Sequence, residues 1–360
     1  MLTQEELKKL NKIKTKTPTV SLYLNADQKY NTPEKILINL KNLLKKSKSL
    51  IGEENYKLVL DQARLVPDKE SKGVVFFLNP REDIAYSYKL NKPFSNQIHI
   101  ENNLHLKPLF LMFDEYERYC TVIVDKEKAK IFSVYLGEIE NITNVFNEFP
   151  GKHRQGGFSQ MRFQRHLNTI EHKNLKEVAD IAYDYFREKE FDRLIIGGTK
   201  EALVEFEKLL HNDLKDKLVG DFYTEMFKND QHFLDQSLKI EEEVERAKEK
   251  EQVKNLIENL GDKNKAISGL DEVLQASFDK KILKLIIKEG LQKSGFICTN
   301  CDKLIYKKDD CSQCENNKEE VADVIDELVQ QVIVQGGEVE FVQESEELEK
   351  MGNVGALLRY

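Results

Sequence analysis

The sequence predicts an α/β fold: three separate α/β domains with mixed sheets, the third of which carries a small zinc-ribbon insertion. The length of 360 residues corresponds to two or three domains at roughly 150 residues each. Strand-like and helix-like segments alternate along the whole chain, which is typical of α/β architectures. Four of the five cysteines fall within residues 298–314, a spacing that indicates a metal-bound insertion. We place the domains at residues 1–115, 116–262 and 263–360, with the ribbon at residues 295–317.

The composition excludes several classes of protein. A hydrophobic fraction of 40%, with 33% charged residues, 17 glycines and 7 prolines, is incompatible with a collagen-like or fully disordered chain. The longest apolar runs, such as Val74 to Leu78, reach about a quarter of the roughly 20 residues needed to cross a bilayer. Residues Met1 to Lys16 contain no apolar stretch followed by a cleavage site. We therefore expect a soluble, cytoplasmic protein that has no membrane partner.

In the first domain, the hydrophobic pattern predicts a sheet with a helix against it. Thr3 can cap a first helix, and Thr19 to Asn25 is rich in the β-branched and aromatic residues that favour a strand. Pro33 opens a helix whose apolar side chains recur every three or four residues, while its lysines occupy the other side. Further strands are expected at Val74 to Leu78 and at Ile84 to Leu90.

The second domain alternates strands and helices in the order of a parallel βαβ unit. The expected elements are strands at residues 120–124, 129–135 and 193–196 and helices at residues 175–186 and 202–210. Gly197 and Gly198 form the turn after the last strand, but they lack the third glycine of a dinucleotide site and the Gly-Lys-Ser/Thr end of a phosphate loop. We therefore do not expect a nucleotide site at this turn.

The third domain follows a long, highly charged helical stretch that Gly261 to Lys265 interrupts. The pattern beyond this break again alternates between helix and strand. The expected elements are helices at residues 270–276 and 321–334 and strands at residues 282–287 and 338–342.

Two Cys-x-x-Cys pairs predict a structural zinc site. Cys298 and Cys301 form the first pair, and Cys311 and Cys314 form the second pair after nine intervening residues. Each pair lets two thiolates converge on one ion, so that four sulfurs close a tetrahedral site. A dithiol redox switch is the alternative for a single pair, but two pairs at this spacing favour zinc. Cys120, alone in an apolar strand, is expected to be inert core packing.

The charge is distributed unevenly along the chain. The formal net charge is −8, which alone would argue against a nucleic-acid partner. The first fifty residues, however, carry eleven lysines and four acids, and residues 152–176 carry six basic residues and one acid. Residues 315–350 hold twelve acids against Lys318 and Lys350. A polyanion such as RNA would therefore meet the first half of the molecule.

Residues 151–165, Gly-Lys-His-Arg-Gln-Gly-Gly-Phe-Ser-Gln-Met-Arg-Phe-Gln-Arg, form the most unusual segment. Gly156 and Gly157 allow the backbone to lie directly against a ligand. No Asp or Glu occurs before Glu171, so any hydrolysis here would depend on positioning and on amide donors. A flexible basic loop is the alternative interpretation. The side chains expected to contact phosphates and bases are Lys152, His153, Arg154, Phe158, Arg162 and Arg165.

This segment resembles the central-domain signature of the archaeal and eukaryotic class I peptide-chain release factors, in which Lys-His-x-x-Gly-Gly-Gln-Ser-x-x-Arg-Phe-x-Arg precedes a long helix. The ending Met351 to Tyr360 resembles the close of that family's third domain, and archaeal members carry a similar four-cysteine insertion before it. Val20 to Leu24 resembles the start of the family's first domain. The resemblance covers essentially the whole chain in the same domain order. The positions of the central signature that fit are Lys152, His153, Gly156, Gly157, Ser159, Arg162, Phe163 and Arg165.

The resemblance implies a role at the peptidyl-transferase centre, where the family's loop glutamine orients the water that cleaves the ester between nascent peptide and tRNA. Phe158 stands at that glutamine's position in this sequence. Gln160 is the expected substitute, similar to the shifted Gly-Gly-x-Ser-Gln patterns of the Vms-like and bacterial branch, and Gln155 is the lesser candidate. An amide suits the task because it donates and accepts hydrogen bonds without becoming charged. The expected catalytic residues are Gly156, Gly157, Ser159 and Gln160.

Stop-codon reading is not expected, because residues 1–109 contain neither the Asn-Ile-Lys-Ser loop nor the Tyr-x-Cys-x-x-x-Phe element of the decoding release factors. The resemblance therefore implies a ribosome rescue factor that hydrolyses peptidyl-tRNA independently of stop codons. The ribosome and peptidyl-tRNA are the expected partners, and a translational GTPase is a candidate partner of the acidic third domain. Two alternatives are a noncatalytic, pelota-like ribosome-binding factor and a nuclease that cuts tRNA near its 3′ end.

Overall fold

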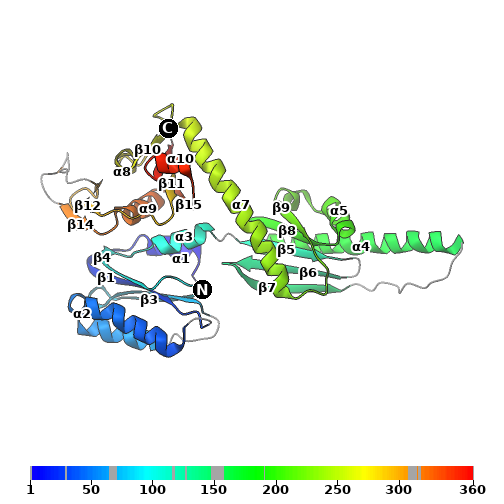
Figure 1. Ribbon diagram of the computed structural model, residues 1–360, viewed down its shortest axis with the longest axis horizontal. Helices are drawn as coiled ribbons and strands as arrows, with labels where there is room; N and C mark the ends of the chain where they lie inside the picture. The colour runs from blue at the N-terminus through cyan, green and yellow to red at the C-terminus, as the bar shows by residue number, and fades with distance from the viewer. Residues whose placement is uncertain are drawn as a thin grey trace. The chain divides into compact units, whose positions relative to one another are not determined.

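The protein is a mixed α/β structure with several sheets, as the sequence predicts (Figure 1). It divides into two compact units, one made of Met1–Glu115 with Lys248–Tyr360 and the other of residues 116–247. The first and third predicted domains thus fall in one unit, and the change between units occurs at residues 247 and 248, within a helix, not after residue 262. The computed structural model describes residues 2–28, 31–64, 71–115, 118–125, 128–146, 158–189, 191–306, 314 and 318–359.

The N-terminal part of the first unit is a four-stranded antiparallel sheet in the order β3-β2-β1-β4. Helix α2 (Pro33–Arg64) packs on the sheet through Ile36, Leu40 and Leu44, which confirms the predicted amphipathic helix. It bends at Gly52, whose φ of 77° lies in the left-handed region that glycine adopts without strain. The strands are β1 (Lys14–Asn25), β2 (Gly73–Asn79), β3 (Ile84–Leu90) and β4 (Gln97–Asn103).

Three short helical segments complete this part. They are α1 (Gln4–Leu10), the 3-10 turn η1 (Pro80–Glu82) and α3 (Lys107–Glu115). Thr3 caps α1 as predicted: its side chain accepts a hydrogen bond from the backbone N–H of Glu6, and the Glu6 carboxylate accepts one from the backbone N–H of Thr3.

The C-terminal part of the first unit contains a second four-stranded sheet, in the order β10-β16-β11-β15. β11 and β15 run parallel, whereas β16 is antiparallel to its two neighbours. Its elements are β10 (Ala266–Ser268), α8 (Leu270–Phe278), β11 (Ile282–Lys288), α9 (Val324–Val334), β15 (Glu338–Val342), α10 (Glu346–Lys350) and β16 (Val354–Leu358). A small three-stranded sheet interrupts this part between β11 and α9: β12 (Gly295–Cys298), β13 (Leu304–Ile305) and β14 (Lys318–Val321).

The second unit is built on a five-stranded sheet in the order β7-β6-β5-β8-β9. Strands β5, β8 and β9 run parallel, which confirms the predicted βαβ arrangement. Gly197 and Gly198 belong to β8 rather than to a turn after it, because they pair in register with β5 and β9. The elements are β5 (Tyr119–Val124), β6 (Lys128–Tyr135), β7 (Glu138–Phe146), α4 (Phe158–Lys189), β8 (Arg193–Gly198), α5 (Lys200–Leu209), α6 (Asn212–Lys215), β9 (Leu218–Tyr223) and α7 (Asp230–Asn259).

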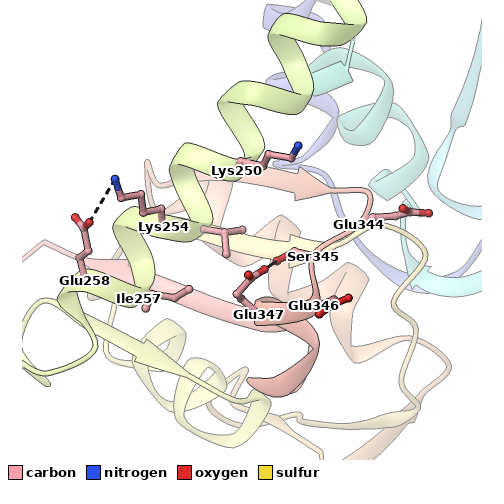
Figure 2. A pocket seen from close by; sticks show the side chains of 9 residues that line it. Lys250, Lys254, Ile257, Glu258, Glu344, Ser345, Glu346 and Glu347 are labelled. Carbon is pink, nitrogen blue, oxygen red and sulfur yellow. Dashed lines mark hydrogen bonds and ion pairs between the residues drawn. The ribbon is translucent and has the colours of Figure 1, made fainter.

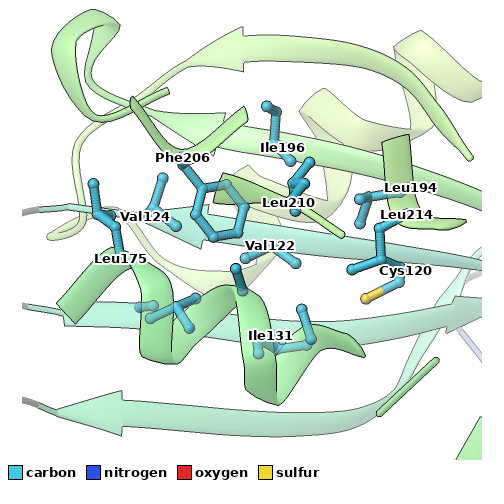
Figure 3. Close-up of a cluster of buried hydrophobic side chains, with 14 of the residues drawn as sticks. Cys120, Val122, Val124, Ile131, Leu175, Leu194, Ile196, Phe206, Leu210 and Leu214 are labelled. Atoms are coloured by element: carbon cyan, nitrogen blue, oxygen red, sulfur yellow. The ribbon is translucent and has the colours of Figure 1, made fainter. Parts of the chain in front are cut away.

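Helices cover both faces of this sheet, because side chains alternate along each strand. On one face, Cys120, Val122 and Val124 of β5 pack with α4 and α5 (Figure 3). On the other face, Tyr119 and Ile123 pack with the start of α7. Cys120 is fully buried, which confirms its predicted role in the core, and burial raises the pKa of its thiol.

Strand β7 occupies a segment expected to be a polar loop. Leu136 and Gly137 link it to β6, with φ angles of 53° and 72°. Two successive residues with positive φ form the tight turn that suits a two-residue hairpin, so the chain folds back along β6. The polar composition of β7 reflects its place at the edge of the sheet. In the part of the chain that the structure describes, no helix has both the length and the apolarity that a bilayer crossing requires.

Candidate functional site

Helix α4 begins at Phe158 and contains the second half of the unusual segment of residues 151–165. Its second half is held in the core by Leu175, Val178, Ala179 and Ala182, all buried against the sheet and α5. No described side chain of α4 before Asn174 is buried. Figure 1 shows the first half of α4 extending past the sheet of its own unit. The helix is therefore an arm whose base is packed and whose described side chains between residues 165 and 173 are exposed or half-buried.

Polar contacts hold the base of this arm. Nδ1 of His172 lies 3.0 Å from Oε1 of Glu205 on α5, and Nε2 of His211 lies 2.9 Å from Oδ1 of Asp180. The rings of Tyr183 and His211 stack with centroids 4.2 Å apart. The hydrogen bond from His211 lowers the pKa of Asp180, and that from His172 lowers the pKa of Glu205. These groups position α4 and do not form a catalytic constellation.

Of the predicted catalytic residues, Ser159 and Gln160 lie in the part of the chain that the structure describes. Gly156 and Gly157 lie outside the described residues, as do the predicted RNA contacts Lys152, His153 and Arg154. Phe158, Ser159, Gln160 and Arg162 lie in the first turns of α4, and the side chain of Arg165 is exposed.

This corrects the sequence interpretation, in which residues 151–165 form one loop. The helix begins at Phe158 because residues after Gly157 include no glycine or proline and several good helix formers. Gln160 therefore lies in the first turn of a helix, two residues after its start. The first N–H groups of a helix have no partner within it and lie at the positive end of its dipole, so this end is suited to negatively charged oxygen atoms.

A candidate metal centre lies in the three-stranded sheet of the first unit. The sulfur atoms of Cys298, Cys301 and Cys314 lie within 4.8 Å of one another, and Cys298 is buried. Cys311 lies outside the described residues. The turn between the first two cysteines is tight, since the N–H of Asp302 donates to the carbonyl of Cys298 and Asp302 has a φ of 58°.

Three converging thiols fit a zinc ion, which binds sulfur at about 2.3 Å and so brings tetrahedral sulfurs to roughly 3.8 Å from one another. The apolar cluster around them is small: Cys298 and Ile305 are buried, with Phe296, Cys301 and Cys314 packed against them. A core of this size is too small to hold three short strands by burial alone. The donor set therefore matches the predicted structural zinc, with Cys311 as the expected fourth ligand.

The predicted basic face of α2 is present. Lys35, Lys41, Lys45 and Lys48 are exposed, while Ile36 and its apolar partners face the sheet. Lys48 is already engaged, because its Nζ lies 3.0 Å from the Glu53 carboxylate. Lys41 and Lys45 belong to the same exposed cationic stripe, which remains the candidate RNA contact of the N-terminal part.

A hollow of about 670 Å³ lies beside α7 in the first unit (Figure 2). Lys250, Lys254 and Ile257 of α7 form one side, and Ser345 with three glutamates from residues 344–347 forms the other. Opposed lysines and glutamates of this kind are typical of a solvated charged surface. None of the predicted catalytic or cysteine residues lines the hollow.

Comparison with known protein families finds matches for residues 105–360. Residues 105–249 match the family described as bacterial archaeo-eukaryotic release factor family 10, and residues 246–360 match eRF1 domain 3. The chain is 28% identical to peptide chain release factor subunit 1 of Methanocaldococcus jannaschii over 85% of this chain and 79% of that protein. It is 26% identical to the same protein of Methanobrevibacter smithii over 99% of this chain and 96% of that protein.

Solved structures with a similar course of the chain include Archaeoglobus fulgidus Pelota, at 15% identity and a TM-score of 0.38 over 99% of this chain and 92% of that one. A ribosome-bound archaeal Pelota with ABCE1 reaches a TM-score of 0.43 at 15% identity, covering 99% and 94% of the two chains.

Proposed function

Because the chain belongs to the family of archaeal and eukaryotic class I peptide-chain release factors, we propose that it hydrolyses peptidyl-tRNA on the ribosome without reading a stop codon. The chain is a release-factor-like translation factor. One observation supports this proposal: Phe158, Ser159 and Gln160, the last three residues of the Gly-Gly-Phe-Ser-Gln segment, lie at the start of α4, the end that projects beyond the packed core. A motif in that place is available to reach into a narrow RNA-lined site.

In the proposed reaction, water attacks the ester carbonyl carbon of peptidyl-tRNA. The bond from that carbon to the ribose oxygen breaks, the peptide leaves as a carboxylic acid, and a proton from the water passes to the departing ribose oxygen, which becomes the 3′ hydroxyl. The amide oxygen of Gln160 accepts a hydrogen bond from the attacking water, and its NH₂ group donates to a neighbouring RNA oxygen. Backbone N–H groups at the start of α4 stabilise the oxygen anion that develops in the transition state.

The surrounding cations bind the phosphates of the acceptor end. Gly156 and Gly157 let the backbone approach the RNA closely, and Ser159 flanks the glutamine. Phe158 stacks on a base. The cations are Lys152, Arg154, Arg162 and Arg165, and His153 is a further RNA contact between the first two.

We also propose a structural zinc ion bound by Cys298, Cys301, Cys311 and Cys314. The convergence of three of these sulfurs supports it. The ion supplies folding free energy to the small sheet and takes no part in hydrolysis.

The acidic stretch of residues 315–350 favours a protein partner over RNA, and a translational GTPase is the candidate.

The test is peptide release from ribosomes stalled with a sense codon in the A site. The natural protein should release peptide, and Gln160→Ala should slow release by roughly 10²-fold or more, as expected for loss of a group that positions the attacking water. Gln164→Ala is the matched control, since it removes the same side chain one helical turn later and should leave the rate unchanged. Equal rates for Gln160→Ala and the natural protein would refute the catalytic assignment.

Two further outcomes separate the alternatives. An inactive natural protein that still binds stalled ribosomes would support a noncatalytic, pelota-like factor, for which Phe158 at the glutamine position is the favouring observation. Shortened tRNA among the products would instead support cleavage of the RNA near its 3′ end.

A further inference from the structure

A buried polar cluster joins the N-terminal sheet of the first unit to helix α9. Glu101 lies in β4, His105 follows that strand, and Asp326 lies in the first turn of α9. The side chains of His105 and Asp326 are 3% and 0% exposed. Asp326 is more than 200 positions from Glu101 and His105 in the chain, so sequence patterns do not reveal this contact.

The atoms of this cluster are close together without forming a complete set of hydrogen bonds. Nδ1 of His105 lies 2.9 Å from Oδ2 of Asp326, yet within the described residues this buried nitrogen completes no well-aligned hydrogen bond. Nitrogen and oxygen ligands at about 2.1 Å from one ion and at right angles lie roughly 3 Å apart. A close but poorly aligned pair is therefore the relation expected of two ligands that share an ion.

Glu101 supplies a third ligand atom. One carboxylate oxygen of Glu101, one nitrogen of His105 and one carboxylate oxygen of Asp326 all lie within 4.8 Å of one another. Two ligands on opposite sides of one ion lie about 4.2 Å apart, so a small movement of the Glu101 side chain would suffice.

The local charge favours a cation. The amino group of Lys107 lies 2.8 Å from Oδ2 of Asp323, which takes up that positive charge. Two carboxylates and one imidazole therefore converge at the candidate site, while the amino group of Lys107 is directed to a different carboxylate.

The neighbouring groups agree with this assignment. The ring of His99 stacks on His105 with centroids 3.6 Å apart, which helps to fix the plane of the His105 ring. The backbone N–H of Lys107 donates to Oδ1 of Asp326, and Nε2 of Gln330 donates to Oδ2. These bonds orient the Asp326 carboxylate, as outer hydrogen bonds do for metal ligands.

We propose that Glu101, His105 and Asp326 bind a divalent transition-metal ion that fastens β4 to α9. One imidazole and two carboxylates suit Mn²⁺ or Zn²⁺. The ion differs from the zinc proposed at the cysteines, because its ligands are harder and come from two distant parts of the chain. When bound, the ion would hold the N-terminal sheet and the C-terminal sheet of the first unit in one arrangement.

In the experiment, the cysteine site of the full-length protein is first saturated with Zn²⁺. Mn²⁺ is then added stepwise, and free Mn²⁺ is followed by electron paramagnetic resonance. One Mn²⁺ per chain should bind, and electron spin-echo measurements should show coupling to one imidazole nitrogen. Glu101→Gln should weaken binding at least tenfold. This variant keeps the shape of the side chain and resembles its protonated form, so it is expected to fold.

Glu319→Gln is the matched control, since Glu319 accepts a hydrogen bond from Asn102 at the same contact but lies outside the cluster. It should bind Mn²⁺ as the natural protein does, and His105→Gln should remove the nitrogen coupling. No binding at millimolar Mn²⁺, or equal binding by Glu101→Gln and the natural protein, would overturn the proposal. Neither result bears on peptide release, which does not involve this cluster.

Discussion

Arg193 shows how one buried charge ties α7 to the sheet of the second unit. It lies at the start of β8, where its guanidinium donates to the carboxylates of Glu241 and Glu245 at 2.5 Å and 2.7 Å. All three side chains are less than 10% exposed. The pairing satisfies charges that would be very costly to bury singly, because the low dielectric of the interior disfavours an unpaired ion.

Replacing Arg193 with Met should therefore destabilise the second unit by about 3–5 kcal/mol, since two buried carboxylates lose their partner. Hydrogen exchange of the α7 amides measures this local loss. Arg118→Met is the control variant. Arg118 pairs with Glu140 at 3.3 Å, and both side chains are partly exposed. Replacing Arg118 should therefore lower the stability of the second unit by only about 0–1 kcal/mol. Similar losses in the two variants would contradict this account of the buried pair.

At the scale of single elements, helix α4 combines a packed base with an exposed arm. Thr169 lies in the exposed part, where its hydroxyl donates to the carbonyl of Arg165. Thr169→Pro should break the helix there, because proline removes a backbone hydrogen bond and clashes with the preceding turn. The core from Leu175 onward should stay folded while peptide release falls at least tenfold.

Release assays and thermal unfolding of the same preparations test this prediction. Thr169→Ala, which keeps the helix and removes only the hydroxyl, should retain nearly all activity. If Thr169→Pro released peptide as fast as Thr169→Ala, the arm would not position the glutamine.

The small cysteine sheet makes a separate element-scale prediction. Metal analysis should find about one zinc per chain at this site, and Cys298→Ser should lose it. Since the apolar cluster there is small, the amides of β12, β13 and β14 should then exchange freely, while those of the second unit keep their protection. A metal-free protein with the same exchange pattern as the natural one would show that the sheet needs no ion.

Local pattern explains which elements could be predicted from the sequence. Strands buried on both faces, such as β2 and β5, and helices with a regular apolar stripe were expected at nearly their observed bounds. β4 and β7 were not, because these edge strands are half exposed and polar, and what makes them strands is pairing with β1 and β6. The start of α4 was placed too late for a related reason: an exposed helical arm has no apolar stripe.

At the scale of the whole molecule, the candidate sites differ in how much the sequence could reveal. The cysteine pairs and the glycine segment are local motifs, so their spacing alone points to their chemistry. The cluster of Glu101, His105 and Asp326 depends on a tertiary contact between residues more than 200 positions apart. No periodicity or motif in either segment predicts that contact, and only the folded structure brings the three ligands together.

The uneven charge of the chain leads to the last prediction, which concerns binding to the ribosome. Lys41 and Lys45 belong to the exposed cationic stripe of α2, in the half of the sequence with excess positive charge. Each lysine that contacts an RNA phosphate releases about one condensed cation, so the logarithm of the binding constant falls linearly with the logarithm of salt concentration. Changing both lysines to glutamine should weaken binding and reduce the magnitude of that slope by roughly 1–2. The control is the double variant Lys254→Gln with Lys263→Gln, which removes the same charge from the part of the chain preceding the acidic stretch. This variant should leave the slope unchanged. An equal effect of the two double variants would mean that net charge, rather than the α2 stripe, governs binding.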